Sequence, residues 1–479
     1  MLFTLAFRHL FVRPARALFL LLGYGIGAGV MMVLLSIGEA MLLQSQDVAL
    51  VGGGEVTVLP EGIDLEGLKS GSMGGMFFGI DRARFVERVM IGGPRFAGVV
   101  QASAPVIEQK LLYLTRGRDT VLVRAGGEIP SRSRLAGAGL PVTAGRWEDA
   151  PEDRRFVSPT AQQLYDELDH FHRPRFRDPS WGEWQYYNVV AGGESWYITY
   201  LVGGDIVGGD WGGQLLVTSP KAGGASRRFL AVAPPSAVHF DTLGADLTIG
   251  PNTVRQRNGI YTLDGRAQGA AGEVRFHLDV TAEPHKYFPP IELSTDRFVS
   301  GYVVPALRAS VSGEICVGGR CTRIDRAPGY HDHNWGVWKD VIWEWGQARG
   351  DHYTVVYGGV RRPDTLAASA PFFLAVLDSL GVSQVLRFDS VAYGRPSPDA
   401  PPTGFDIVAA TDADTVKLTV RVDQVQASEA VQSSFGRAFL QMRGEFKLEG
   451  TAGRRVVSDF GTGFFETFLT KHKTSEQRR

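Results

Sequence analysis

The sequence predicts a mainly β protein that is preceded by one transmembrane helix and a small α+β module. Glycine and proline, 59 and 25 of 479 residues, supply roughly 18% of the chain against about 12% in average proteins, which favours short strands and turns. Hydrophobic residues make up 44% and charged residues 21%, so the chain can bury a core, and its length suggests about two or three domains. A long apolar stretch near the N-terminus separates the helix from the β-rich remainder.

Residues 1–16 form the predicted cytoplasmic tail and residues 17–38 the predicted transmembrane helix. The apolar stretch contains no ionisable group except the Tyr24 phenol and would span roughly 33 Å as a helix, which matches the hydrocarbon core of a bilayer. Basic residues precede it and acidic residues follow it, so the N-terminus should be cytoplasmic and the main domain periplasmic, at the inner membrane. A cleaved signal peptide is the alternative, but its apolar region should be only about 7 to 15 residues long.

The expected partners follow from this helix and from the charge balance. Two overlapping pairs of small residues let another transmembrane helix approach closely, and they are formed by Gly23, Gly25, Gly27 and Gly29. We therefore expect contact with the lipid bilayer and with other transmembrane subunits. Basic and acidic residues number 50 and 51, which argues against the basic surface that nucleic-acid binding normally requires.

After the helix, the chain divides into four predicted segments. Residues 39–150 form the small α+β periplasmic module, and residues 151–180 form a linker with a helix at 161–168. His170 and His172 in this linker could ligate a metal, but an isolated pair is more often a solvated surface, and we assign no metal site. Residues 181–365 and 366–479 form two packed, barrel-like β halves. Strands are predicted at 184–190, 195–202, 213–219, 245–249, 274–280, 298–304, 307–311, 353–360, 372–377, 384–393, 416–425 and 439–448.

The two cysteines flank a predicted hairpin turn at Gly318-Gly319. In that hairpin Cys316 faces Cys321 in a non-hydrogen-bonded pair, where side chains approach most closely. The sequence therefore predicts a cross-strand disulfide, which fits an oxidising compartment such as the periplasm. Two free thiols on the hairpin are the alternative.

Tryptophan is concentrated in one segment, residues 328–347. If residues 342–347 form a strand, Trp343 and Trp345 share one face and Glu344 lies on the other. A wall of indoles suits a flat apolar ligand. The structural alternative is a hairpin whose tryptophans fill a barrel and whose polar residues cap loops.

This segment, together with Glu-Trp-Gln-Tyr-Tyr-Asn-Val at 183–189 and Trp-Tyr-Ile-Thr-Tyr-Leu-Val-Gly-Gly-Asp at 196–205, resembles the hydroxyneurosporene synthase (carotenoid hydratase) family and related lipocalin-like proteins. The resemblance covers about residues 181–393 and extends weakly beyond. It implies two lipocalin-like barrel halves in tandem, a carotenoid or other isoprenoid ligand, and addition of water to a terminal double bond without a cofactor.

Such a hydratase needs a protonated acid in an apolar pocket, aromatic faces to stabilise a carbocation and a group that positions water. The candidates for proton transfer are His333, Asp332 and Glu344, and by alternation His331 and His333 share a face opposite Asp332. The predicted ligand-binding residues are Trp335, Trp338, Trp343, Trp345 and Tyr357. On the family motif His333 and Trp335 match best, but where the family is expected to place a carboxylate after a tyrosine this chain reads Tyr357-Gly358-Gly359. A metal at His331, Asp332 and His333 is a further alternative.

The motifs Arg-Pro-Ala-Arg at 13–16, Leu-Leu-Ser-Ile-Gly-Glu-Ala at 34–40, Gly-Gly-Glu-Val-Thr-Val-Leu-Pro at 53–60 and Ala-Gly-Arg-Trp at 144–147 resemble the start of ABC-transporter permeases of the macrolide-exporter type. Those permeases carry three further membrane helices, for which no later window here is apolar enough. This leaves a second function class open, a non-catalytic structural subunit of a pigment-bearing photosynthetic complex or of a transporter assembly.

Overall fold

The computed structural model describes residues 14–50, 86, 103–104, 106–116, 119–128, 160–220, 226–295, 298–361, 372–411, 414–429, 437–453 and 455–470. The chain divides into two compact units. One comprises residues 1–58 and 90–150, and the other comprises residues 59–89 and 151–479. Most of the predicted module at 39–150 lies outside the described residues.

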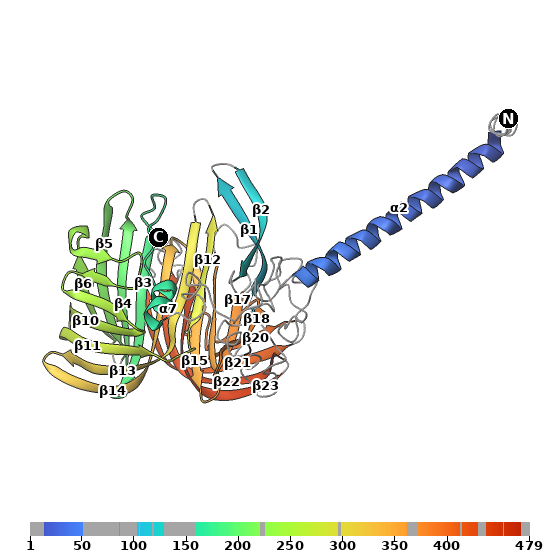
Figure 1. The fold of residues 1–479 in the computed structure, drawn as a ribbon. Coiled ribbons are helices and arrows are strands. Elements are labelled where there is room, and N and C mark those ends of the chain that lie inside the picture. The colour runs from blue at the N-terminus through green and yellow to red at the C-terminus, as the bar shows by residue number, and fades with distance from the viewer. Residues whose placement is uncertain are drawn as a thin grey trace, which may run out of the picture. The chain divides into compact units, whose positions relative to one another are not determined.

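The described residues of the first unit form a long helix and a hairpin, apart from a few isolated positions (Figure 1). Helix α2 (Pro14–Leu50) is continuous over 37 residues, and β1 (Val106–Arg116) pairs antiparallel with β2 (Asp119–Glu128). In the part of the chain that the structure describes, no helix was found with the length and apolar character that crossing a membrane requires. The transmembrane helix at 17–38 stays a prediction.

The second unit begins with a short helix and a closed barrel, which we call the first barrel. Helix α7 (Ala161–Leu168) confirms the helix predicted inside the linker, and Thr160 caps it by accepting a hydrogen bond from the backbone N–H of Gln163. The barrel strands, in chain order, are β3 (Trp181–Ala191), β4 (Glu194–Asp205), β5 (Asp210–Ser219), β6 (Arg227–Ala233), β10 (Ile260–Gly269), β11 (Gly272–Ala282), β13 (Phe298–Val317) and β14 (Arg320–Val337). Each strand pairs antiparallel with the next, and β14 pairs with β3, so the eight strands close on themselves.

Shorter elements flank this barrel. The one-turn 3₁₀ helix η2 (Pro235–Ala237) precedes a small extension of the sheet. That extension is formed by β7 (Val238–Phe240), β8 (Leu247–Ile249) and β9 (Asn252–Arg257), which joins β10. Strand β12 (Phe288–Thr295) pairs with β13.

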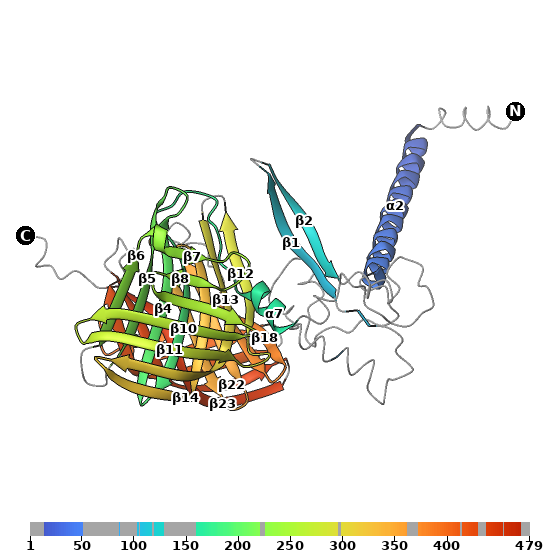
Figure 2. The same ribbon diagram turned by 60° about the vertical axis from the view of Figure 1, so that its left-hand side comes forward.

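A second closed barrel follows directly (Figure 2). Its strands are β15 (Ile342–Gly350), β16 (Thr354–Arg361), β17 (Phe372–Asp378), β18 (Gly381–Phe388), β20 (Gly404–Ala410), β21 (Thr415–Glu429), β22 (Arg437–Ala452) and β23 (Arg455–Thr470), with β19 (Ala392–Gly394) beside β20. Pairing of β18 with β20 and of β23 with β15 closes this ring of eight. The predicted tandem of two barrel-like β halves is therefore confirmed, and both halves are closed barrels.

The second barrel begins earlier in the chain than predicted. The sequence predicts a boundary between the halves at 365/366, but β15 and β16 already belong to the sheet of the second barrel. The chain passes from one barrel to the other between Val337 and Ile342, in a turn where Asp340 has a positive φ of 57°. Neither proline nor glycine marks residues 338–341, so the local sequence carries only the weak turn signal of Asp340.

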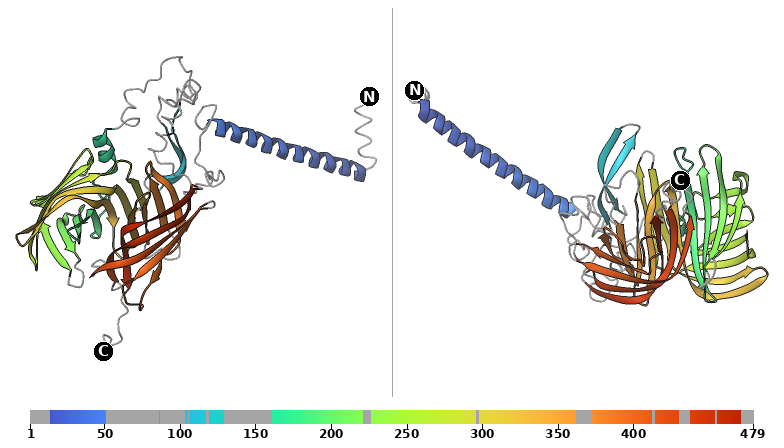
Figure 3. Two further views of the ribbon diagram at one scale, coloured as in Figure 1. Left: turned by 90° about the horizontal axis from the view of Figure 1, so that it is seen from below. Right: turned by 180° about the vertical axis from the view of Figure 1, so that it is seen from behind.

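The two barrels lie side by side, and a hydrophobic cluster joins them (Figure 3). Each barrel also has its own apolar core. The joining cluster contains Tyr186, Tyr197 and Tyr330 from the first barrel, and Trp345, Val356 and Leu377 are among its members from the second. Outer faces of both barrels that would otherwise meet water are buried here.

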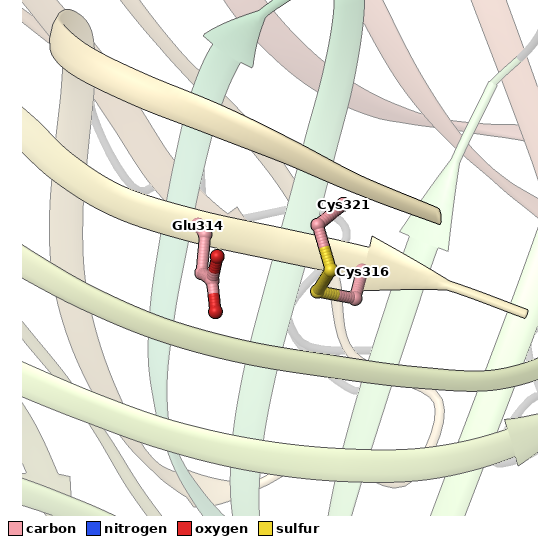
Figure 4. Close-up of side chains that lie close together, drawn as sticks. All are labelled: Glu314, Cys316 and Cys321. Carbon is pink, nitrogen blue, oxygen red and sulfur yellow. A yellow bond between two sulfur atoms is a disulfide. The ribbon is translucent and has the colours of Figure 1, made fainter. Parts of the chain in front are cut away.

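The predicted disulfide is present at the far end of the β13–β14 hairpin. Cys316 is bonded to Cys321 in the predicted register, and Gly318 and Gly319 both take the positive φ angles that the two-residue turn requires. Glu314 lies beside the disulfide on the same strand (Figure 4). Because both sulfur atoms are used in the disulfide, this trio of residues is not a metal site.

Replacing both cysteines by serine should lower the free energy of unfolding by about 2 kcal/mol, because the bond closes only a short loop. Denaturant titration of the unreduced protein measures this difference. In the wild type, alkylation without a reductant should label neither thiol. Two labelled thiols by mass spectrometry would contradict the bond.

Candidate functional site

The segment after helix α7 enters the core of the first barrel. Tyr165 and Leu168 of the helix are buried, and Tyr165 packs edge-on against Tyr261 of β10. Asp169 is completely buried, and Phe171 is 1% exposed and packs against the His333 ring. The sequence predicts a linker at 151–180. This segment instead fills the barrel interior with its own side chains.

A chain of buried polar groups connects this segment to β14. Asp169 lies between two histidines, with its Oδ2 2.9 Å from His331 Nε2 and its Oδ1 2.5 Å from His333 Nδ1. His333 Nε2 is 3.1 Å from Glu183 Oε1, and that carboxylate also lies 2.8 Å from Nδ1 of the partly exposed His172. Each group is matched by an opposite charge or a hydrogen-bond partner, as buried polar groups require.

The charges in this chain of groups stabilise one another. Burial acts to raise the pKa of Asp169, but the charge of His333 and the hydrogen bonds from both histidines hold it well below its usual value. Burial acts to lower the pKa of His333, but Asp169 and Glu183 outweigh that effect and raise it to about 9. The network is therefore an ion-paired clamp at neutral pH, and it holds the segment inside the barrel.

A pocket lies between the two barrels, on the opposite side of β14. It leaves about 30 Å³ for the centres of water molecules and is partly open to solvent, so in this conformation it is narrow for a small-molecule site. Its walls come from β3, β13 and β14 of the first barrel and from β15, β16 and β23 of the second. The lining residues are Trp184, Tyr186, Ser300, Tyr302, Asp332, Asn334, Trp338, Trp343, Trp345, Gly359, Val360 and Glu466.

Asp332 is the first of two buried carboxyl groups in this pocket. Its Oδ2 accepts a 2.7 Å hydrogen bond from the Tyr330 hydroxyl, and its Oδ1 accepts a 2.8 Å bond from the Asn334 amide. Burial, followed by the charge of Glu466, raises the pKa of Asp332 to about 8. Asp332 is therefore mainly protonated at neutral pH.

Glu466 on β23 is the second carboxyl group, and it is not among the residues predicted from the sequence. Its Oε2 accepts a 3.1 Å hydrogen bond from the Trp343 indole, and its Oε1 accepts a 3.3 Å bond from Gln441. Burial raises the pKa of Glu466 to about 6 against these two bonds. At neutral pH it is mainly ionised, while Asp332 is not. The available signal was one carboxylate inside the run Phe464-Phe465-Glu466-Thr467-Phe468, in a segment that was not predicted as a strand.

The structure brings four of the predicted site residues together in this pocket. They are Asp332, Trp338, Trp343 and Trp345. Strand β14 shows the predicted alternation. His331 and His333 point into the first barrel, and Asp332 faces the pocket on the other side of the strand. The structure thus places His333 among the groups that hold Asp169 rather than among those that line the pocket.

Three other predicted residues also lie elsewhere. Trp335 stacks on the His172 ring at 3.9 Å and donates to Glu292, in the region of the first barrel's clamp. Tyr357 is fully buried in the core of the second barrel. Glu344 faces away from the pocket, where it accepts hydrogen bonds from Tyr393 and Thr467, and burial raises its pKa to about 7.

Gly359, where the family resemblance led us to expect a carboxylate, does line the pocket. A side chain there would be strained, because its φ is 158° and a Cβ atom would meet Phe372 at 2.3 Å. The carboxylate comes instead from the other neighbour of β15. Trp345 is paired with Gly358 on one side and with Glu466 on the other.

The pocket thus holds two carboxyl groups of different pKa between aromatic walls. Pairs whose environments push their pKa values apart are the signature of an acid and a base working together. The indoles of Trp343 and Trp345 are held in place by hydrogen bonds to Glu466 and to Tyr330. This arrangement can deliver a proton, stabilise a positive charge and accept a proton from water.

Comparisons with known proteins add little to this geometry. The sequence matches no family model and no curated protein. Among solved structures, it is similar to an AttH-like protein from Nitrosomonas europaea (15% identity, 69% of this chain and 100% of that chain, TM-score 0.44). It is also similar to CghA with Sch210972 (12% identity, 61% of this chain and 90% of that chain, TM-score 0.43). A third similar structure is kievitone hydratase from Nectria haematococca (13% identity, 60% of this chain and 88% of that chain, TM-score 0.39). With TM-scores below 0.5, these likenesses carry no argument about this chain.

The two buried aspartates should respond to substitution in opposite ways. Asp169→Ala leaves buried, charged His333 without its main partner and should lower the free energy of unfolding by about 3 to 5 kcal/mol. Asp332→Asn removes a carboxyl that must gain a proton on folding at pH 7, because its pKa is raised, and should therefore keep or raise the free energy of unfolding.

The pH dependence gives the second half of this test. Because folding raises the pKa of Asp332, its contribution to stability is lost as pH rises through about 8. We therefore expect the free energy of unfolding of Asp332→Asn, relative to that of the wild type, to be larger at pH 9 than at pH 6. Denaturant titration of both proteins at the two pH values measures this difference. An equal difference at both values would show that Asp332 is already ionised at pH 6.

Proposed function

We propose that the pocket between the barrels binds an isoprenoid, such as an acyclic carotenoid, and adds water to its terminal double bond. The observation that carries the proposal is the Asp332 carboxyl, which has a pKa of about 8 and faces a pocket walled by indoles. A carboxylic acid that stays protonated at neutral pH beside aromatic faces suits protonation of an alkene.

In this reaction Asp332 gives its proton to the less substituted carbon of the double bond. The π electron pair becomes the new C–H bond, and a tertiary carbocation forms on the neighbouring carbon. The faces of Trp343 and Trp345 stabilise that charge. Both oxygens of Asp332 already accept hydrogen bonds, from Tyr330 and Asn334, and these bonds stabilise the carboxylate that is left behind.

Water then attacks the cation, and its excess proton goes to ionised Glu466. The new C–O bond gives a tertiary alcohol, and the net reaction is alkene plus water. Protons exchange with solvent to restore protonated Asp332 and ionised Glu466. No step needs a redox change.

We further propose that the chain is attached to the inner membrane with this domain in the periplasm. The apolar side chains along the described part of α2, including Leu22, Met32 and Leu35, are exposed. A bilayer would cover them and would supply an isoprenoid ligand by lateral diffusion.

A second candidate function, a structural subunit of a membrane complex, is favoured by the same helix. Around Gly23, Gly25, Gly27 and Gly29, an added Cβ atom would meet nothing within 4 Å. A second helix could therefore pack closely there. Co-purification of a partner in mild detergent would support this candidate, and a chain that always purifies alone would count against it.

The proposed hydratase should show a bell-shaped pH profile. Purified protein incubated with an acyclic carotenoid that ends in an isopropylidene group should yield a product heavier by one water. The rate should rise through about pH 6, as Glu466 ionises, and fall through about pH 8, as Asp332 ionises. A lack of both polyene binding and hydrated product in the wild type would defeat the proposal.

Variants assign the two limbs of that profile. Asp332→Asn should lower the rate by about a hundredfold or more. Glu466→Gln should remove the acid limb and move the alkaline limb to lower pH, because the charge of Glu466 helps to raise the pKa of Asp332. Glu344→Gln is the matched control, since this buried carboxyl lies on the opposite face of β15. It should keep the wild-type profile. Loss of a limb in this variant would show that Glu344, and not a carboxyl group of the pocket, takes part in the reaction.

A further inference from the structure

A second, smaller cavity lies next to the pocket between the barrels. It leaves about 10 Å³ for the centre of a water molecule, which is about the space that one water needs. It is lined by Tyr186, Asn188, Tyr197, Tyr330, Trp345, Gln347, Gln441, Met442, Phe464, Phe465 and Glu466. Three residues, Tyr186, Trp345 and Glu466, belong to the walls of both cavities. Glu466 therefore stands between two compartments.

Asn188 is the distinctive polar group of this second cavity. It lies on β3, paired with Tyr330 on one side and with Tyr197 on the other, and it is only 2% exposed. Its Nδ2 makes no hydrogen bond of normal length and geometry to any residue that the structure describes, although it lies close enough to the Tyr186 hydroxyl to act against the burial that raises the pKa of that group. A buried donor left in this state costs about 1 to 3 kcal/mol, so native proteins normally satisfy it with water or ligand.

The groups around Asn188 suit one water molecule. A buried water needs two to four polar partners and a small space, and the cavity offers the Asn188 amide, the Glu466 carboxylate and the Tyr186 hydroxyl. Gln441 donates to Glu466 Oε1 and so fixes the direction in which that carboxylate points. The remaining walls are mainly aromatic, with buried Gln347 as a further polar residue.

We propose that this cavity holds the water that reacts in the proposed hydration. Asn188 and Glu466 bind it, and Gln441 is a positioning residue that acts through Glu466. The inference rests on the proposed function and adds the place from which water enters. The water oxygen forms the C–O bond to the cation in the larger pocket, and the proton it loses goes to the Glu466 carboxylate beside it.

The separation of water from alkene predicts two different effects of substitution. Asn188→Leu fills the cavity with an apolar side chain but leaves Asp332 and the indole walls in place. In D₂O, the acyclic carotenoid should still gain deuterium through reversible protonation by Asp332, while formation of the alcohol should fall about a hundredfold. Gln441→Met should likewise keep deuterium uptake and lose alcohol formation, but the loss should be smaller. Affinity for the polyene, measured by its absorbance shift, should not change.

Each outcome decides between the two proposals. Equal loss of deuterium uptake and alcohol in folded Asn188→Leu, or no loss of either, would overturn the water site and leave the hydratase proposal standing. A wild type that shows neither reaction would defeat the hydratase proposal itself.

Two further measurements do not depend on activity. A high-resolution crystal structure should show a water within hydrogen-bond distance of Asn188 Nδ2 and of a Glu466 oxygen, and a dry cavity would overturn the inference. Thr354→Val is the matched control, because Thr354 Oγ1 is another buried group without a hydrogen bond among the described residues and lines neither cavity. This variant should keep both reactions at wild-type levels, with melting temperature reporting the fold of all variants. Loss of the alcohol alone in Thr354→Val would show that the split is not specific to the cavity, and would overturn the assignment.

Discussion

The site depends on one contact, in which the outer face of β14 is buried against β15 and β23 of the second barrel. On an isolated barrel this face would meet water, and Asp332 would be an ordinary surface carboxylate. Burial between the barrels removes that water and raises the pKa of Asp332, and Glu466 on the facing strand raises it further. The hydrogen bond from Trp345 to the Tyr330 hydroxyl, which itself donates to Asp332, ties the acid of one barrel to a wall residue of the other. The pocket and the raised pKa of Asp332 therefore depend on the pair of barrels and on neither alone.

The interior of the first barrel is used differently. An eight-stranded barrel has room for side chains or for one small ligand. Here the interior is occupied by Phe171 and by Asp169, which is hydrogen-bonded to two histidines. Since consecutive residues of β14 point to opposite sides, the same strand holds the clamp with His331 and His333 and offers the acid with Asp332. A rigid, ion-paired interior on one side fixes the position of the carboxyl on the other.

Local sequence patterns predicted what depends on neighbours along the chain. Two-residue alternation gave the faces of β14 and β15, and the Gly318-Gly319 turn gave the disulfide register. What they could not supply is which outer faces become buried, because that depends on packing between barrels formed by strands far apart in the sequence. Glu466 was missed for this reason: its strand pairs with Trp345, more than a hundred residues earlier. Asp169 was assigned to a linker because its partners lie on β14. His333 and Trp335 matched the family motif, but a motif does not show on which side of a strand the pocket lies.

The most direct test of this account is the protonation state of Asp332 in the resting protein. Infrared difference titration of the wild type against Asp332→Asn should show the carbonyl band of a protonated carboxylic acid at pH 7, which disappears as pH rises through about 8. In Glu466→Gln the same band should disappear at lower pH, because the neighbouring charge is gone. A wild type without that band at pH 7 would mean that Asp332 is already ionised, and the proposed proton donor would be lost.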